Sequence, residues 1–92
     1  MRPRPKQRTT RRRQIEREFA QLQVKVGRAF GPHLRNLRER RRMSQGELAG
    51  ERYDRSFVAK LESGASLPSL EALVELADRL GLGPRALIPK EL

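Results

Sequence analysis

The sequence predicts an all-α protein with one small folded domain, and three observations support this. None of the 92 residues lies in an alternating run rich in Val, Ile or Thr, the pattern of a half-buried strand. Apolar residues recur instead at intervals of three and four, as on one face of a helix. Ser, Asp and Gly stand where such runs begin and end. A domain of this size buries roughly 60–65% of its unfolded surface, so we expect marginal stability.

The first 13 residues have the composition of a disordered arm. Seven are Lys or Arg, two are Pro and none is acidic. Apart from Met1 there is no large apolar side chain, so burial cannot offset the entropy lost on ordering. We expect residues 1–13 to be a basic disordered arm. It serves either as a solubilising tail or as a contact for DNA phosphates and the minor groove.

Residues 14–28 have the pattern of an amphipathic helix. One apolar face repeats at intervals of four, three and four residues: Ile15, Phe19, Leu22 and Val26. We expect this face to pack on the chain's own domain; packing against a second subunit is the alternative. Gly27 and the Gly31-Pro32 pair then interrupt the pattern. Pro32 is acceptable in the first turn of a helix, so a new helix is expected there, opening a domain over residues 29–90.

Two short helices joined by a tight turn are predicted at the centre of the chain. Ser44 and Glu47 have the spacing of a capping box at the start of the first helix. Asp54 can cap the second, and Gly64 supplies its stop. Apolar side chains would hold the pair together, namely Leu48, Ala49, Val58 and Leu61. The second helix then turns a polar, partly basic face outward, made of Arg55, Ser56, Ala59 and Lys60. This is the layout of a helix-turn-helix that reads the DNA major groove.

A further helix and a short turn complete the predicted domain. Ser69 is placed to cap a helix that Gly81 ends. Its apolar positions have helical spacing: Leu70, Leu73, Val74, Ala77 and Leu80. Gly83-Pro84 opens a last turn with Leu87 and Ile88.

Five motif blocks between Phe30 and Ile88 resemble the phage-repressor type of helix-turn-helix, the XRE or lambda-repressor-like family. The blocks are Leu34-Arg-Asn-Leu-Arg38, Met43-Ser-Gln-Gly-Glu-Leu-Ala49, Asp54-Arg-Ser-Phe-Val-Ala-Lys-Leu-Glu62, Pro68-Ser-Leu70 and Ala77-Asp-Arg-Leu-Gly81. In length and layout the chain looks closest to restriction-modification controller proteins and mobile-element regulators. The resemblance implies a domain of about five helices, here with an extra N-terminal helix and the basic arm.

The resemblance also implies roles for individual residues. Arg55, Ser56 and Lys60 match the positions that most often contact bases, and Arg55 can fork onto a guanine. Ala59 can touch a thymine methyl group. Gln45 matches a glutamine that contacts phosphate and braces the start of the recognition helix, beside Ser44 as cap. Ser63 matches a position that often meets the DNA backbone. Arg38 and Glu62 match an enclosed salt bridge, which we interpret as structural.

One departure from the family pattern concerns the turn. Four residues, Gly50 to Tyr53, separate Ala49 from Asp54, where the family usually has five with a glycine in the turn. Arg52 or Tyr53 then stands where a left-handed glycine would help. Either the turn is tighter or the first helix is shorter, and the aim of the recognition helix depends on which.

Charge and composition restrict the partners. The net charge of +10 is uneven: residues 1–42 hold 15 Lys/Arg against 3 Asp/Glu, and residues 43–92 hold 6 against 8. Such a field attracts polyanions without choosing among them. The absence of cysteine excludes disulfides and thiolate chemistry, and no phosphate loop, metal-ligand spacing or catalytic set occurs. We therefore expect no enzyme activity, no cofactor, no metal and no membrane partner, and a cytoplasmic location.

These observations predict a sequence-specific regulator of transcription that binds double-stranded DNA as a homodimer on a partly palindromic operator. The dimer interface is expected around Leu82, Leu87 and Ile88 or on the N-terminal helix. One alternative keeps the fold but binds another protein, as an antiactivator or antitoxin-like module. Another is nonspecific binding to nucleic acid or an anionic membrane surface, driven by the arm alone.

Overall fold

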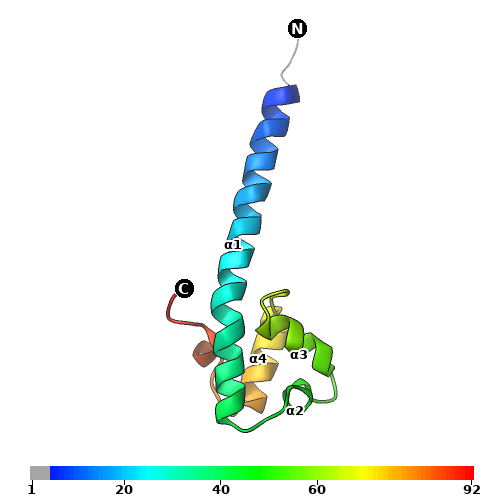
Figure 1. The fold of residues 1–92 in the computed structure, drawn as a ribbon, viewed down its shortest axis with the longest axis vertical. Helices are drawn as coiled ribbons and strands as arrows, with labels where there is room; N and C mark the ends of the chain where they lie inside the picture. The colour runs from blue at the N-terminus through cyan, green and yellow to red at the C-terminus, as the bar shows by residue number, and fades with distance from the viewer. Residues whose placement is uncertain (1–4) are drawn as a thin grey trace.

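A long helix and a small bundle packed around its C-terminal half make up the protein (Figure 1). The computed structural model describes residues 5–92, and all its regular elements in that range are helical. They are α1 (Pro5–Arg40), α2 (Gln45–Ala49), α3 (Arg55–Glu62), α4 (Leu70–Arg79) and the 3₁₀ turn η1 (Pro84–Leu87). The expected all-α class is confirmed for these residues.

The core lies where α2, α3, α4 and η1 meet the C-terminal half of α1. Leu34 contributes the side chain of α1 that is most completely enclosed, at 0% exposure. The predicted contacts between the two short helices are present, because their four apolar side chains are all buried. The rest of the core comes from the last helix and turn. Its buried members are Phe30, Leu34, Leu48, Ala49, Val58, Leu61, Leu76, Ala77, Leu80 and Leu87.

The expected break at Gly27 and Gly31-Pro32 is wrong, because α1 runs through all three residues. The two glycines let the backbone of α1 approach the backbone at the end of α3 closely. A Cβ on Gly27 would lie 2.8 Å from the carbonyl oxygen of Gly64, and one on Gly31 would lie 2.3 Å from that of Glu62. Pro32 removes one helical N–H donor, a loss that packing of the surrounding turns against the core offsets.

The expectation of disorder over residues 1–13 also differs from the structure. Residues 5–13 are helical and continue α1, while residues 1–4 lie outside the described residues. The segment is rich in Arg, Lys and Gln, which have good helix propensity. Extending an existing helix also avoids the unfavourable nucleation step, so these residues add turns to one already formed. Pro5 occupies the first helical position, where its missing N–H is tolerated.

The apolar face of the N-terminal half of α1 does not pack on its own domain, contrary to the first expectation. Ile15, Phe19 and Leu22 remain 56%, 59% and 53% exposed. The reason is geometric: a straight helix of 36 residues is about 54 Å long and projects past the bundle. Figure 1 shows this half of α1 standing clear of the other elements, and the molecule measures 64 × 27 × 19 Å.

Two contacts fix the C-terminal half of α1 to its surroundings. His33 Nε2 donates to the carbonyl oxygen of Ala86 at 2.7 Å and so ties α1 to η1. At the end of the helix the Met43 N–H donates to the Arg38 carbonyl oxygen at 3.2 Å. Arg42, between Arg38 and Met43 in the chain, has φ +55. This is the left-handed conformation that glycine usually adopts at a helix end. The chain then turns directly into α2.

Candidate nucleic-acid interface

The start of α2 is built by the capping box that the sequence predicts. The Glu47 N–H donates to Ser44 Oγ at 3.0 Å, and the Ser44 N–H donates to Glu47 Oε1 at 2.7 Å. The first N–H groups of any helix lack partners within that helix, and such groups favour an anion.

The helix α3 begins with a cap that also engages Ser56, one of the base contacts that the resemblance implies. The Phe57 N–H donates to Asp54 Oδ1 at 3.0 Å. The Ser56 hydroxyl donates to the same oxygen at 2.6 Å, so it is free to accept a hydrogen bond from a base but not to donate one. These hydrogen bonds, first that of Ser56 and then that of Phe57, hold the pKa of Asp54 below its ordinary value. The cap therefore stays charged at neutral pH.

The outward face of α3 carries two exposed cations. Arg55 is the first residue of the helix and Lys60 lies about 1.4 turns further on, and neither forms an ion pair with any described residue. Ala59 is half-buried between them, so only part of its methyl surface faces outward. Ser63 ends the helix with its hydroxyl donating to the Lys60 carbonyl oxygen at 3.1 Å. This face therefore has a long hydrogen-bond donor side chain at each end and the small side chain of Ala59 between them.

Arg38 and Glu62 come together in a nearly enclosed ion pair. Arg38 Nε and Nη2 donate to the two carboxylate oxygens of Glu62 at 2.6 and 3.0 Å, and the side chains are 11% and 5% exposed. Arg38 Nη1 also donates to the Met43 carbonyl oxygen at 2.8 Å. One guanidinium therefore joins the end of α1, the loop before α2 and the end of α3.

Gln45 belongs to the same cluster, which corrects one expected role. Its Nε2 donates to Glu62 Oε1 at 3.0 Å, so it contacts the end of α3 and not the start. Burial alone raises the pKa of Glu62, but the hydrogen bonds from Arg38 and Gln45 and the Arg38 charge outweigh it and hold the pKa below its ordinary value. The hydrogen bond to Glu62 raises the pKa of Arg38. Both groups are charged in the folded protein.

The shortened turn between α2 and α3 is accommodated without strain at Arg52 or Tyr53. The helix α2 has only five residues, and it is Gly50, with φ +67, that takes the positive φ in this turn. Tyr53 stacks on Phe57 with ring centroids 4.4 Å apart. Of the two alternatives, the structure has the shorter first helix.

The contacts that hold this turn include residues that sequence reasoning missed. Arg52 Nε lies 3.0 Å from Glu75 Oε2, and Arg79 Nη2 lies 3.8 Å from the same oxygen. The Arg79 guanidinium also covers Gly50, where a Cβ would lie 2.1 Å from its central carbon. The signal available in the sequence was the spacing of four between Glu75 and Arg79, which puts them together on a helix.

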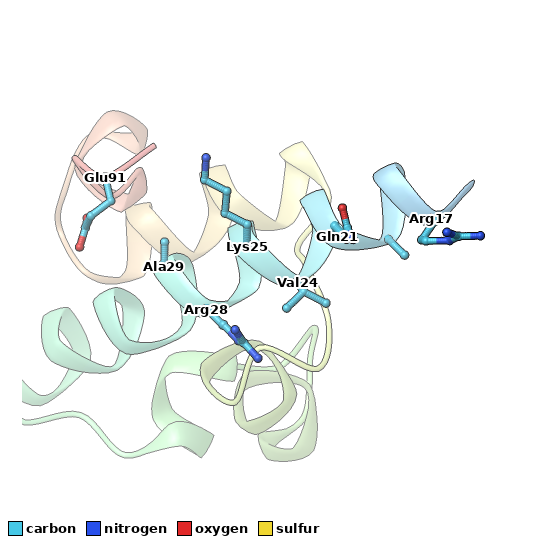
Figure 2. Close-up of a pocket in the computed structure, with 8 residues that line it drawn as sticks. Arg17, Gln21, Val24, Lys25, Arg28, Ala29 and Glu91 are labelled. Atoms are coloured by element: carbon cyan, nitrogen blue, oxygen red, sulfur yellow. The ribbon is translucent and has the colours of Figure 1, made fainter. Parts of the chain in front are cut away.

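One hollow of the molecule lies away from this face. An open hollow runs along α1 beside the C-terminal segment (Figure 2), lined mainly by long polar side chains and Val24. Residues 5–92 contain no cluster of His, Asp and Glu able to hold a metal ion. Nor does any helix among them have the length and apolar character needed to cross a membrane.

Comparison with known proteins places the domain. The sequence profile of the family described as Helix-turn-helix domain matches residues 29–89, about two thirds of the chain. No curated protein and no solved structure gave a match. The matched range includes the capped pair α2 and α3 and the Arg38–Glu62 ion pair that joins them to α1. The chain is therefore a member of the helix-turn-helix domain family.

Proposed function

We propose that the protein regulates transcription by sequence-specific binding of double-stranded DNA, as a homodimer with one recognition helix in each half of a partly palindromic operator. The observation that carries this proposal is the outward face of α3, where Arg55 and Lys60 are exposed and have no acidic partner among the described residues. A guanidinium at the first position of a groove-entering helix can donate to both acceptors of a guanine edge.

The surroundings of α3 support the same geometry. The N–H groups at the start of α2, with Ser44 and Gln45, are placed to meet phosphate oxygens, which fix position and carry no sequence information. Gln45 already donates to Glu62, so its second amide hydrogen is the one that remains for a phosphate. In this arrangement Arg55 and Lys60 read bases, Ala59 meets a thymine methyl group, and Ser56 accepts. Ser63 contacts the backbone by turning its hydroxyl hydrogen from the Lys60 carbonyl oxygen to a phosphate oxygen.

The test compares Arg55→Ala with Arg85→Ala, which removes another exposed arginine, from η1. Binding sites are first selected from random DNA, and affinities for the selected and a scrambled duplex are then measured by fluorescence anisotropy at several salt concentrations. Arg55→Ala should reduce the preference for the selected duplex by about 1–3 kcal/mol. Arg85→Ala should leave that preference unchanged. Equal losses on both duplexes from Arg55→Ala would count against base readout.

The basic segment provides a second measurement of the same function. Removing residues 1–13 should weaken binding to both duplexes alike and make the salt dependence less steep, because phosphate contacts that do not depend on the DNA sequence are lost. A selective loss on the operator duplex would contradict this role.

A protein partner is the second candidate function, favoured by an apolar patch on α4. Leu70 and Val74 are 74% and 46% exposed and lie among Glu71, Glu75 and Asp78 in a shallow hollow. A partner with an apolar and basic surface would fit there. If the protein showed no preference among duplexes and formed a stoichiometric complex through Leu70, the antiactivator or antitoxin-like alternative would replace the DNA-binding proposal.

A further inference from the structure

The N-terminal half of α1 presents a long apolar stripe that nothing in the described chain covers. Ile15, Phe19 and Leu22 are each more than half exposed, and Val26 continues the stripe to the edge of the bundle. The spacing of four, three and four is that of the two apolar positions of a coiled-coil heptad. A stripe with this regular spacing fits another helix better than an irregular surface.

We propose that this stripe pairs with the same stripe of a second copy of the chain, with the two α1 helices antiparallel. This inference deepens the proposed function, because it names the interface of the homodimer. A two-fold axis passing beside Ala20 and Gln21 aligns Ile15 with Val26 of the second copy, and Phe19 with Leu22 of the second copy. The four layers close into a symmetric dimer that leaves no stripe unpaired.

The charges beside the stripe select the antiparallel direction. Glu18 and Lys25 are seven residues apart and occupy equivalent heptad positions on one flank. In an antiparallel pair like flanks face each other, so Glu18 of each copy meets Lys25 of the other. Figure 2 shows Lys25 projecting from α1 on the side away from Val24 and Arg28.

The basic N-terminal end of α1 also favours the antiparallel direction. In a parallel pair the Arg11-Arg12-Arg13 runs of the two copies would lie about 10 Å apart, the usual distance between packed helices. In the antiparallel pair they are separated by about 25 Å along the axis, roughly three Debye lengths at physiological salt. Each run then lies near Ala29 of the other copy, with Arg28 and Glu91 beside it. The repulsion between the two runs is therefore reduced.

The size of the contact predicts a reversible dimer. The stripe extends over about 17 Å of helix, so the paired surface is at or below the lower limit of stable interfaces, about 1,200 Å² in total. Leu87, the centre of the other expected interface, is fully buried in its own core and offers no surface, which leaves Leu82 and Ile88 there. We expect a dissociation constant on the order of 10 μM for the full chain in solution.

The first experiment is sedimentation equilibrium of the full chain and of two variants with matched chemistry. Leu22→Glu places a charge in the stripe, and Val24→Glu places the same charge about 200° away around the helix at a residue 49% exposed. Leu22→Glu should raise the dissociation constant at least about 30-fold, and Val24→Glu less than about threefold. A wild-type chain that is monomeric at about 500 μM, or a dimer lost through Leu70→Glu but kept in Leu22→Glu, would overturn the proposal.

Charge reversal tests the direction of the helices. Glu18→Lys and Lys25→Glu should each weaken the dimer about three- to tenfold at low salt, and the double variant should restore it, because the facing charges are again opposite. A double variant that does not recover the affinity lost in the single variants, or single variants that bind as tightly as the wild type, would show that these flanks do not face each other and refute the arrangement. Because the sequence has no cysteine, Ile15→Cys and Val26→Cys proteins can also be mixed, and only the mixture should form a disulfide-linked dimer.

Failure of this interface can be distinguished from failure of the DNA-binding proposal. The Leu22→Glu monomer keeps α3 intact, so it should bind a duplex carrying one half-site with unchanged affinity while losing the extra affinity for two half-sites. Undiminished preference for two half-sites would refute α1 pairing alone. A dimeric chain that ignores DNA sequence would refute base readout alone.

Discussion

The two halves of α1 have similar apolar stripes and very different surroundings. In the C-terminal half Leu34 is fully enclosed by the bundle, whereas in the N-terminal half Leu22 is 53% exposed. The local pattern is nearly the same in both, so the pattern determines that a helix forms but not what covers it. The difference comes from length: the bundle reaches α1 only from about Val26 onward, where small residues let α3 approach closely.

Arg38→Ala, in the C-terminal half of α1 that packs on the bundle, should produce the largest loss of stability. It would leave the Glu62 carboxylate, 5% exposed, without its main partner, and removing one member of an enclosed pair costs about 3–5 kcal/mol. Urea unfolding should show this loss, while Arg35→Ala should change stability by less than about 0.5 kcal/mol because its pair with Glu39 is exposed. Loss of DNA selectivity with an unchanged melting temperature would show that Arg38 is not structural.

Paired leucine substitutions compare the two halves directly. Leu34→Ala should destabilise the domain by about 2–5 kcal/mol, because it leaves a cavity in the core. Leu22→Ala, measured in dilute solution where the chain is monomeric, should change the stability by less than about 0.5 kcal/mol. Thermal unfolding followed by circular dichroism measures both. Similar effects from the two substitutions would mean that the N-terminal half of α1 is covered within one chain.

Sequence predicted the local features of the site and missed the contacts between distant segments. Ser44, Asp54 and Ser69 were correctly identified as caps, because a cap depends on residues three positions away. Gly27 and Gly31 were misread as a break, since their role depends on the Glu62 and Gly64 carbonyl groups more than 30 residues later. The five-residue α2 likewise depends on contacts from α4 that no local pattern specifies.

Acid should lower the stability of the bundle around the C-terminal half of α1. The projecting N-terminal half of α1 should stay helical. The pKa of Glu62 is lower in the folded protein than in the unfolded chain, so its contribution to stability is present above its ordinary value of 4.5 and is lost as pH falls through the folded-state value. Urea unfolding between pH 7 and pH 3 should therefore show falling stability below about pH 4.5. Glu62→Gln, although less stable at pH 7, should show a smaller decline over that range. An equal decline would assign the acid sensitivity to other carboxylates.

The smallest expected effect concerns the C-terminal end of α1, where the packed half stops. Arg42 has φ +55, a conformation that glycine adopts without the steric penalty of a Cβ. Arg42→Gly should therefore stabilise the fold by about 0.5–1 kcal/mol, the relief of strain exceeding the entropy gained by the unfolded chain. Arg41→Gly, one residue earlier and without a positive φ, should destabilise by a similar amount. Both substitutions remove the same charge. Changes of opposite sign in the free energy of unfolding would therefore attribute the effect to backbone conformation.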